Sequence, residues 1–229
     1  VDLRRFSDIE PVDLRSSFDL AGTELVMVMV ANFRQQKDHP TVLRALAELP
    51  PEVRRRLGLV FVGSTTSEAT FFERCMAMMD ELGIGDRIRI AGEQEDPLRL
   101  IAGADGAVLA SKNETGPLVV LEYMACGVPF VVTDTGEITR AIRHLGIGYT
   151  PAPRDHHEVA QALAALLDLG SAGRRAMGDK GREVAASVFD QELVTRGIEE
   201  IYHWLLTRGA GAGTRGPRVA LRSDPMART

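Results

Sequence analysis

The sequence has little of what marks several large classes of protein. Its 229 residues include only two cysteines, Cys75 and Cys126, which excludes a disulfide framework and a cysteine-rich metal site. Such sparse cysteine usage is typical of a reducing compartment, and we expect a cytoplasmic protein. No apolar run approaches the ~18 residues that a membrane span needs. The net charge of −5 provides no overall positive field, so nucleic acid is not an expected partner.

What the sequence does have is a regular alternation of short apolar runs and helical patterns. Residues 25–31 are all apolar, too continuous for a half-exposed strand and too short for a helix, which predicts a central parallel strand. Further strands are predicted at 58–63, 88–92, 106–109, 130–133 and 148–150. This order predicts an α/β fold, a Rossmann-like doubly wound parallel sheet of about six strands, with ligands at the carboxyl ends of the strands.

The two ends of the chain differ in composition from its middle. Residues 1–22 are polar and irregular and are expected to be a linker, whereas residues 23–206 form the predicted domain. Extra helices close this domain at 156–169, 174–188 and 191–206. Residues 207–229 are rich in Gly and Arg, which predicts a disordered tail. A G-x-G-x-x-G pattern at 211–216 follows no strand, so we do not expect it to bind a dinucleotide.

The most informative stretch runs from Ser111 to Asp134. A strand end is followed by a polar loop, Pro117 at the start of a helix, Gly127 as its cap, and the next strand. A helix that begins at the carboxyl end of a strand points its free N–H groups into the crevice above the sheet, where anions bind. Because proline has no N–H, the amides of Leu118 and Val119 are the predicted phosphate contacts.

Two glutamates flank this predicted anion site. Glu114 lies in the loop before the helix, and Glu122 lies about one and a half turns into it. A carboxylate repels phosphate unless it is aimed at hydroxyl groups. A ligand that carries both phosphate and hydroxyls satisfies both requirements, and a nucleotide-sugar is such a ligand.

This stretch resembles the donor-site signature of a known enzyme family. Glu114-x7-Glu122, followed by Met-Ala-Cys-Gly-Val-Pro and the pair Thr133-Asp134, is similar to retaining GT-B glycosyltransferases of the family 4 type. The resemblance covers about residues 24–206. It implies the C-terminal donor-binding half of a GT-B fold, which transfers a sugar from a nucleotide-diphosphate sugar with retention of anomeric configuration. It also implies that no metal and no cofactor is needed.

The same resemblance implies that the chain is a fragment. In the family, a stretch like Val1-Asp2-x3-Phe6 follows the amino-terminal domain, and this chain begins without Met. We therefore expect a missing N-terminal domain that binds the acceptor. Any peripheral contact with a membrane is expected through that missing half.

The resemblance assigns the diphosphate to the loop after the first strand. The family's loop usually supplies an Arg and a Lys; Lys37 matches the Lys, while Asn32 stands where the Arg is expected. Arg34, two residues further on, is the candidate to compensate. Together with the amides of Leu118 and Val119, these residues form the expected diphosphate site.

The resemblance also assigns the sugar and the base. Glu122 is expected to accept hydrogen bonds from the ribose, and Glu114, the candidate catalytic residue, from the donor sugar; whether it acts chemically or only positions the sugar stays open. Gly116 belongs to the same donor loop, and Gly92 is expected to face the base through its backbone. The family usually has a glycine where Glu137 stands, which removes one close backbone approach.

Three other functions would use the same residues. The chain could be a donor-binding module without turnover of its own, or part of a GT-B epimerase or phosphorylase that shares the sheet and phosphate site. A hydrolase could use Glu114 and Glu122 as an acid–base pair, but the neighbouring anion site is expected to keep Glu122 from holding a proton. The base, the sugar and the acceptor cannot be predicted from these residues.

His156 and His157 form the one histidine pair in the sequence. They have no Cys, Asp or Glu partner at metal-ligand spacing and are adjacent, so we interpret them as the start of a helix rather than as a metal site.

Overall fold

The computed structural model describes residues 1–207. The predicted tail, except Thr207, and the glycine pattern at 211–216 lie outside the described residues. Within the described part, no helix is both long and apolar enough to cross a bilayer.

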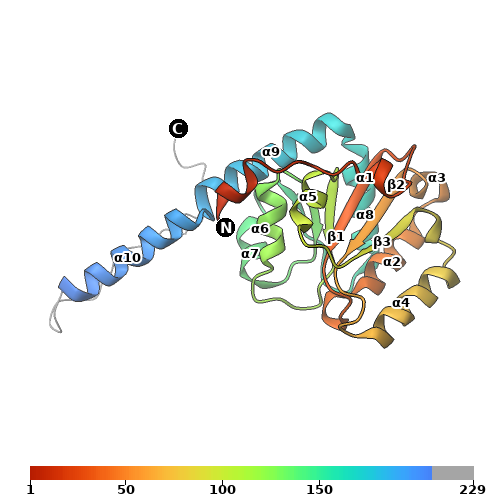
Figure 1. The fold of residues 1–229 in the computed structure, drawn as a ribbon, viewed down its shortest axis with the longest axis horizontal. Coiled ribbons are helices and arrows are strands. Elements are labelled where there is room, and N and C mark those ends of the chain that lie inside the picture. Colours follow the sequence, from red (N-terminus) through yellow and green to blue (C-terminus); the bar gives the residue numbers. More distant parts are fainter. Residues whose placement is uncertain (208–229) are drawn as a thin grey trace.

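Six parallel strands form one sheet in the order β3-β2-β1-β4-β5-β6 (Figure 1). The strands are β1 (Leu25–Val30), β2 (Leu57–Val62), β3 (Ile88–Gly92), β4 (Gly106–Leu109), β5 (Phe130–Val132) and β6 (Gly148–Tyr149). The prediction of a Rossmann-like parallel sheet of about six strands is confirmed. The strand order reverses between β1 and β4, which pair directly. In such folds the ligand crevice opens outside the carboxyl ends of the strands at this reversal.

Helices connect the strands and cover the sheet. The longer ones are α2 (His39–Glu48), α4 (Ala69–Glu81), α5 (Pro97–Ala102), α6 (Leu118–Ala125), α7 (Gly136–Ile142), α8 (His156–Asp168), α9 (Gly170–Val188) and α10 (Gln191–Thr207). The short ones are η1 (Leu3–Phe6), α1 (Leu14–Ser17), η2 (Gln35–Lys37), α3 (Pro51–Arg54) and η3 (Gly85–Arg87). Helices α2 and α8 lie side by side, as do α6 and α9.

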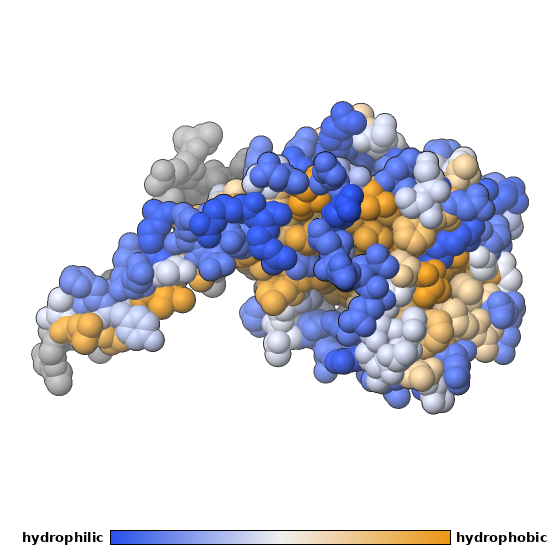
Figure 2. All heavy atoms as spheres, in the orientation of Figure 1, coloured by the Kyte–Doolittle hydropathy of each residue, from blue (hydrophilic) through white to orange (hydrophobic). Residues whose placement is uncertain are grey.

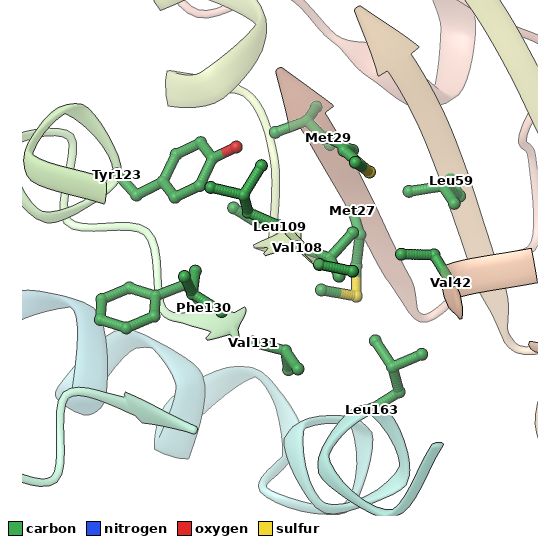
Figure 3. Close-up of a cluster of buried hydrophobic side chains, with 14 of the residues drawn as sticks. Met27, Met29, Val42, Leu59, Val108, Leu109, Tyr123, Phe130, Val131 and Leu163 are labelled. Atoms are coloured by element: carbon green, nitrogen blue, oxygen red, sulfur yellow. The ribbon is translucent and has the colours of Figure 1, made fainter. Parts of the chain in front are cut away.

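The core lies between the central strands and the helices that cover them. Every residue of β1 is buried except the half-buried last one, as expected for a strand covered on both faces. Figure 3 shows Met27 of β1, Val42 of α2 and Leu163 of α8 pointing toward one another. Burying each such side chain contributes about 1.5–3 kcal/mol to folding. The Tyr123 hydroxyl accepts a hydrogen bond from the Val30 amide at 3.2 Å, which links α6 to β1.

The segment expected to be a linker, residues 1–22, lies against this core. Leu14 and Leu20 are fully buried, and the side chain of Asp13 caps the short helix α1. The apolar side chains of this stretch therefore contribute to the packing of the domain. Their isolated positions in a polar stretch carry no periodic pattern, which is why the sequence alone did not indicate the packing.

Helix α10 differs from the other long helices because none of its residues is buried. It extends away from the domain in Figure 1, and apolar side chains gather along one side of it in Figure 2. The exposed apolar residues of α10 are Leu193, Val194, Ile198, Tyr202, Leu205 and Leu206.

Candidate functional site

Two loops meet at the carboxyl edge of the sheet, one after β1 and one after β4. The Lys112 amide donates to the Gln36 carbonyl at 2.8 Å, and Gln36 Nε2 donates to the Asn113 carbonyl at 2.9 Å. Because β1 and β4 are neighbours in the sheet, their loops leave it side by side. These hydrogen bonds join the two loops into one wall of the crevice.

The side chains of Lys37 and Glu114 meet across this junction. Lys37 Nζ lies 2.6 Å from Glu114 Oε1, and the two side chains are 25% and 11% exposed. A second, longer pair joins Lys112 Nζ to Asp38 Oδ1 at 3.7 Å. The structure therefore brings together the cation and the carboxylate that the sequence predicted for one site, and it makes them direct partners.

A third element holds the Glu114 loop from the other side. Gly136, at the start of α7, has φ +81°, and a Cβ there would lie 2.8 Å from both the Glu114 and the Thr115 carbonyl oxygens. The Glu137 amide donates to the Thr115 carbonyl at 3.1 Å, while its side chain is exposed and pairs with Arg140. Glu137 thus keeps a backbone contact with the loop that carries Glu114, although it stands where the resemblance leads us to expect a glycine.

The start of α6 opens into the same loop region. Pro117 is the N-cap and makes no side-chain capping bond, and its carbonyl accepts from the Val120 amide at 3.0 Å. The amides of Leu118 and Val119 have no acceptor within the helix, as at any helix start. The Leu118 side chain is 70% exposed, whereas Gly116 sits close to Ile138 of α7.

Glu122 lies further along α6, and its environment differs from the expected one. Burial raises the pKa of its carboxyl, opposed by the positive charge of Arg5 in the N-terminal segment. The sequence argument expects the anion site to depress this carboxyl's hold on a proton, whereas in the structure loss of hydration acts in the opposite direction and disfavours the charged form. Within residues 1–207, no hydrogen bond or ion pair joins Glu122 to Lys37 or Glu114.

Asn32 and Arg34 occupy different environments at the start of the β1 loop. Asn32 Oδ1 accepts from the Ser64 amide at 2.9 Å, so this side chain fastens the β1 loop to the β2 loop. Arg34 is exposed, in extended backbone, and directly precedes η2.

Gly63 is a position that the sequence reasoning missed. It has φ +143°, and a Cβ there would lie 2.5 Å from the Ala31 carbonyl oxygen. Its amide donates to the carbonyl of Gly92 at 2.8 Å, and Gly92 itself has φ +69°. A glycine at the end of a predicted strand was the available signal. Gly63 thus brings the end of β2 close to the β1 loop and joins it to the end of β3.

His39, the first residue of α2, follows Lys37 by two residues and is buried in the domain. Its ring stacks on Phe33 with centroids 4.1 Å apart and is fully buried. Burial lowers the pKa of His39 to about 3, so this side chain is neutral. The positive charge at the β1 and β4 loops comes instead from Lys37, Arg34 and Lys112.

One cluster in the described part of the chain has the composition of a metal site, away from these loops. Glu48 at the end of α2 contacts both His156 and His157 at the start of α8. The helix-start interpretation is confirmed. The sequence shows no carboxylate at metal-ligand spacing, and the structure supplies one from another helix, 109 residues away in the chain.

The sequence comparisons agree with the geometry. A sequence model of the family described as "Glycosyl transferases group 1" matches residues 13–184. N-acetyl-alpha-D-glucosaminyl L-malate synthase of Bacillus anthracis is 31% identical over 207 residues, which cover 90% of this chain and 52% of that protein. D-inositol 3-phosphate glycosyltransferase of Mycobacterium sp. (strain JLS) is 33% identical over 180 residues, which cover 76% and 39%. The chain thus spans about half or less of these relatives.

Solved structures show the same fold. A glycosyltransferase from Rickettsia africae superposes with a TM-score of 0.81 at 20% identity, covering 91% of this chain and 56% of that one. Anabaena HepE in complex with UDP-glucose superposes with a TM-score of 0.77 at 21% identity, covering 89% and 55%.

Proposed function

Because this chain belongs to the glycosyl transferases group 1 family, we propose that it is the donor-binding half of an enzyme that transfers a sugar from a nucleotide-diphosphate sugar. We propose further that transfer retains the configuration at the anomeric carbon, as the family 4 signature implies. The observation that carries this proposal is the 2.6 Å contact between Lys37 Nζ and Glu114 Oε1, beside the open start of α6.

The diphosphate of the donor is proposed to bind at the start of α6. The amides of Leu118 and Val119 and the ammonium group of Lys37 are donors that are already in place before the reaction. As the bond between sugar and phosphate breaks, negative charge grows on the departing diphosphate, and preorganised donors stabilise this charge most. Arg34, which is exposed in the same loop as Lys37, is proposed as a further phosphate contact. In this proposal the reaction needs no metal and no cofactor.

Glu114 is proposed to hold the sugar. Its carboxylate accepts hydrogen bonds from sugar hydroxyls, while Lys37, with three N–H donors, keeps one bond to Glu114 and turns another toward a phosphate oxygen. The Lys37–Glu114 pair thereby fixes the distance between the sugar and the leaving group. We propose first that Glu114 positions the sugar. Kinetic measurements on a Glu114 variant test whether it also takes part in the chemistry.

Glu122 is proposed to accept from the ribose hydroxyls. Its half-buried carboxylate is costly without partners, and two hydroxyl donors would lower that cost. The backbone around Gly92, held by Gly63, would face the base. UDP-glucose is bound in the HepE structure, which supports a nucleotide-sugar donor without identifying the base or the sugar used here.

The acceptor site is proposed to belong to a second domain outside this chain. The exposed apolar side of α10 is the surface we expect to pack on that domain, since large apolar patches mark contact sites. We therefore expect this chain alone to bind the donor weakly and to transfer nothing. Its two free cysteines are consistent with the cytoplasm as the site of action.

Calorimetric titration with UDP-, GDP- and ADP-glucose tests the proposal. One of them should bind saturably, and Lys37→Ala should weaken binding by roughly tenfold or more, because a charge-assisted hydrogen bond contributes ~1.5–3 kcal/mol. Lys180→Ala, an exposed lysine on α9, is the matched control and should bind as the parent does. Equal affinities for parent and Lys37→Ala, or no binding of any of the three, would overturn the proposal.

A further inference from the structure

Three side chains with metal-binding atoms meet where α2 and α8 touch. Glu48 is the last residue of α2, and His156 and His157 are the first two residues of α8. These helices lie side by side, so their contact is part of the packed domain and not a chance approach of loops. None of the three residues belongs to the loops that hold Lys37 and Glu114.

The ligand atoms are close enough to share one ion. Glu48 Oε1 lies 2.7 Å from His157 Nδ1, and Glu48 Oε2 lies 3.7 Å from His156 Nε2. One ligand atom from each residue lies within 4.8 Å of the others. Zinc holds His nitrogen and carboxylate oxygen at about 2.0–2.2 Å, so two of its ligands can stand up to ~4.2 Å apart. The three ligand atoms are therefore close to the spacing that one shared ion requires.

The types of ligand atom favour certain metal ions over others. Two imidazole nitrogens and one carboxylate oxygen suit Zn²⁺ and the neighbouring first-row ions Ni²⁺ and Cu²⁺, whereas Mg²⁺ and Ca²⁺ prefer oxygen ligands throughout. The centroids of the two imidazole rings lie 4.3 Å apart, so both rings stand together beside Glu48. One divalent cation would use the lone pairs of both rings and neutralise Glu48.

The surroundings leave room for the ion to enter. The side chains of His156, His157 and Glu48 are 34%, 66% and 39% exposed, so an ion reaches them directly from solvent and water can complete its coordination. The backbone of His156 and His157 is held at the start of α8, because the Asp155 side chain accepts a hydrogen bond from the Glu158 amide and caps the helix. The two histidines are therefore presented from an ordered helix start.

We propose that Glu48, His156 and His157 form a binding site for a zinc-like divalent transition-metal ion, which fastens the end of α2 to the start of α8. The ion plays no part in the proposed sugar transfer. Its expected effect is on the stability of the contact between α2 and α8, because an ion that binds only the folded arrangement stabilises it.

Titration of the untagged, metal-free chain with ZnCl₂ in a calorimeter tests this site. We expect one saturable equivalent of Zn²⁺, and we expect Zn²⁺ to raise the melting temperature. The double substitution His156→Ala with His157→Ala should remove more affinity than the roughly 10–100-fold that loss of a second-shell group costs. Glu48→Gln, which keeps the size of the side chain, should weaken binding without affecting the fold.

The matched control is His144→Ala, an exposed histidine that is not in the cluster. It should leave Zn²⁺ affinity and the Zn²⁺-dependent rise in melting temperature unchanged. Zn²⁺ affinity in the double variant or in Glu48→Gln equal to that of the parent, or no saturable binding to the parent, would overturn the proposal. These readouts use Zn²⁺ alone, so they are independent of whether the chain binds a nucleotide-sugar.

Discussion

The carboxyl edge of the sheet and helix α10 differ in how far contacts within the chain hold their side chains. At the carboxyl edge, the loops after β1 and β4 are joined by hydrogen bonds, Lys37 and Glu114 pair, and Gly136 packs on the loop that carries Glu114. In α10, by contrast, no residue is buried and six large apolar side chains are exposed.

The two regions differ in what surrounds their side chains. At the carboxyl edge, the polar side chains are preorganised by contacts within the chain. The apolar side of α10 is exposed rather than covered by this domain, so it adds little to the stability of the domain. The proposed donor site is therefore held by contacts within the chain, whereas the apolar side of α10 is not.

The largest effect is expected at Glu114. In the whole protein, Glu114→Gln should reduce kcat by roughly 100- to 1000-fold, the cost of losing a preorganised electrostatic contact in an active site. Nucleotide affinity should change far less, because the proposed contact is to the sugar. Turnover and the Kd of the nucleoside diphosphate are the two measurements. Glu137→Gln, an exposed acid nearby, is the control, and comparable losses in both quantities for Glu114→Gln would contradict the role.

The next largest effect is expected at Gly136, which packs on the loop that carries Glu114. Gly136→Ala should lower the free energy of unfolding by ~3 kcal/mol, because it adds a clash with the Glu114 and Thr115 carbonyls to the ~1–2 kcal/mol cost of a left-handed residue. Gly170→Ala, with φ +64° and open space around it, should cost only the latter. Urea unfolding measures both. Equal losses would mean that the Gly136 contact does not constrain the loop.

An acid titration tests the burial of His39. The pKa of His39 falls from 6.5 to about 3 on folding, so the unfolded chain binds a proton that the folded one rejects. The resulting stability is present above pH 6.5 and is lost on acidification, by ~1.4 kcal/mol per pH unit, or ~2 kcal/mol down to about pH 5. Urea unfolding of the parent and of His39→Phe at several pH values isolates this slope. Parallel curves for the two proteins would refute the assignment.

The smallest effect is expected in α10. Ile198→Ala should change the free energy of unfolding of this chain by no more than ~0.5 kcal/mol, the usual range for a surface substitution. Leu163→Ala in α8 should cost ~2–5 kcal/mol, because it leaves a cavity under β1. Urea unfolding compares the two. A large loss for Ile198→Ala would show that α10 packs on this domain in solution, and the contrast between the two regions would fail.

Most of the fold could be predicted because its signals are local. The continuous apolar run of β1 indicated a strand covered on both faces, and the Pro117 start and Gly127 cap of α6 lie where the backbone requires them. Gly63 escaped prediction because its role depends on the Ala31 carbonyl of another strand. The packing of Leu14 and Leu20 escaped for the same reason.

The sequence by itself determined which segments become strands and helices, their alternation, and the resemblance that points to a sugar donor. These are properties of neighbouring residues, read through period, turn chemistry and capping. Only the tertiary structure decided that Lys37 meets Glu114 across 77 residues, and that Glu48 meets His157 across 109. Such contacts depend on which strands pair and which helices pack, and that choice is made by burial of the whole core rather than by any local pattern.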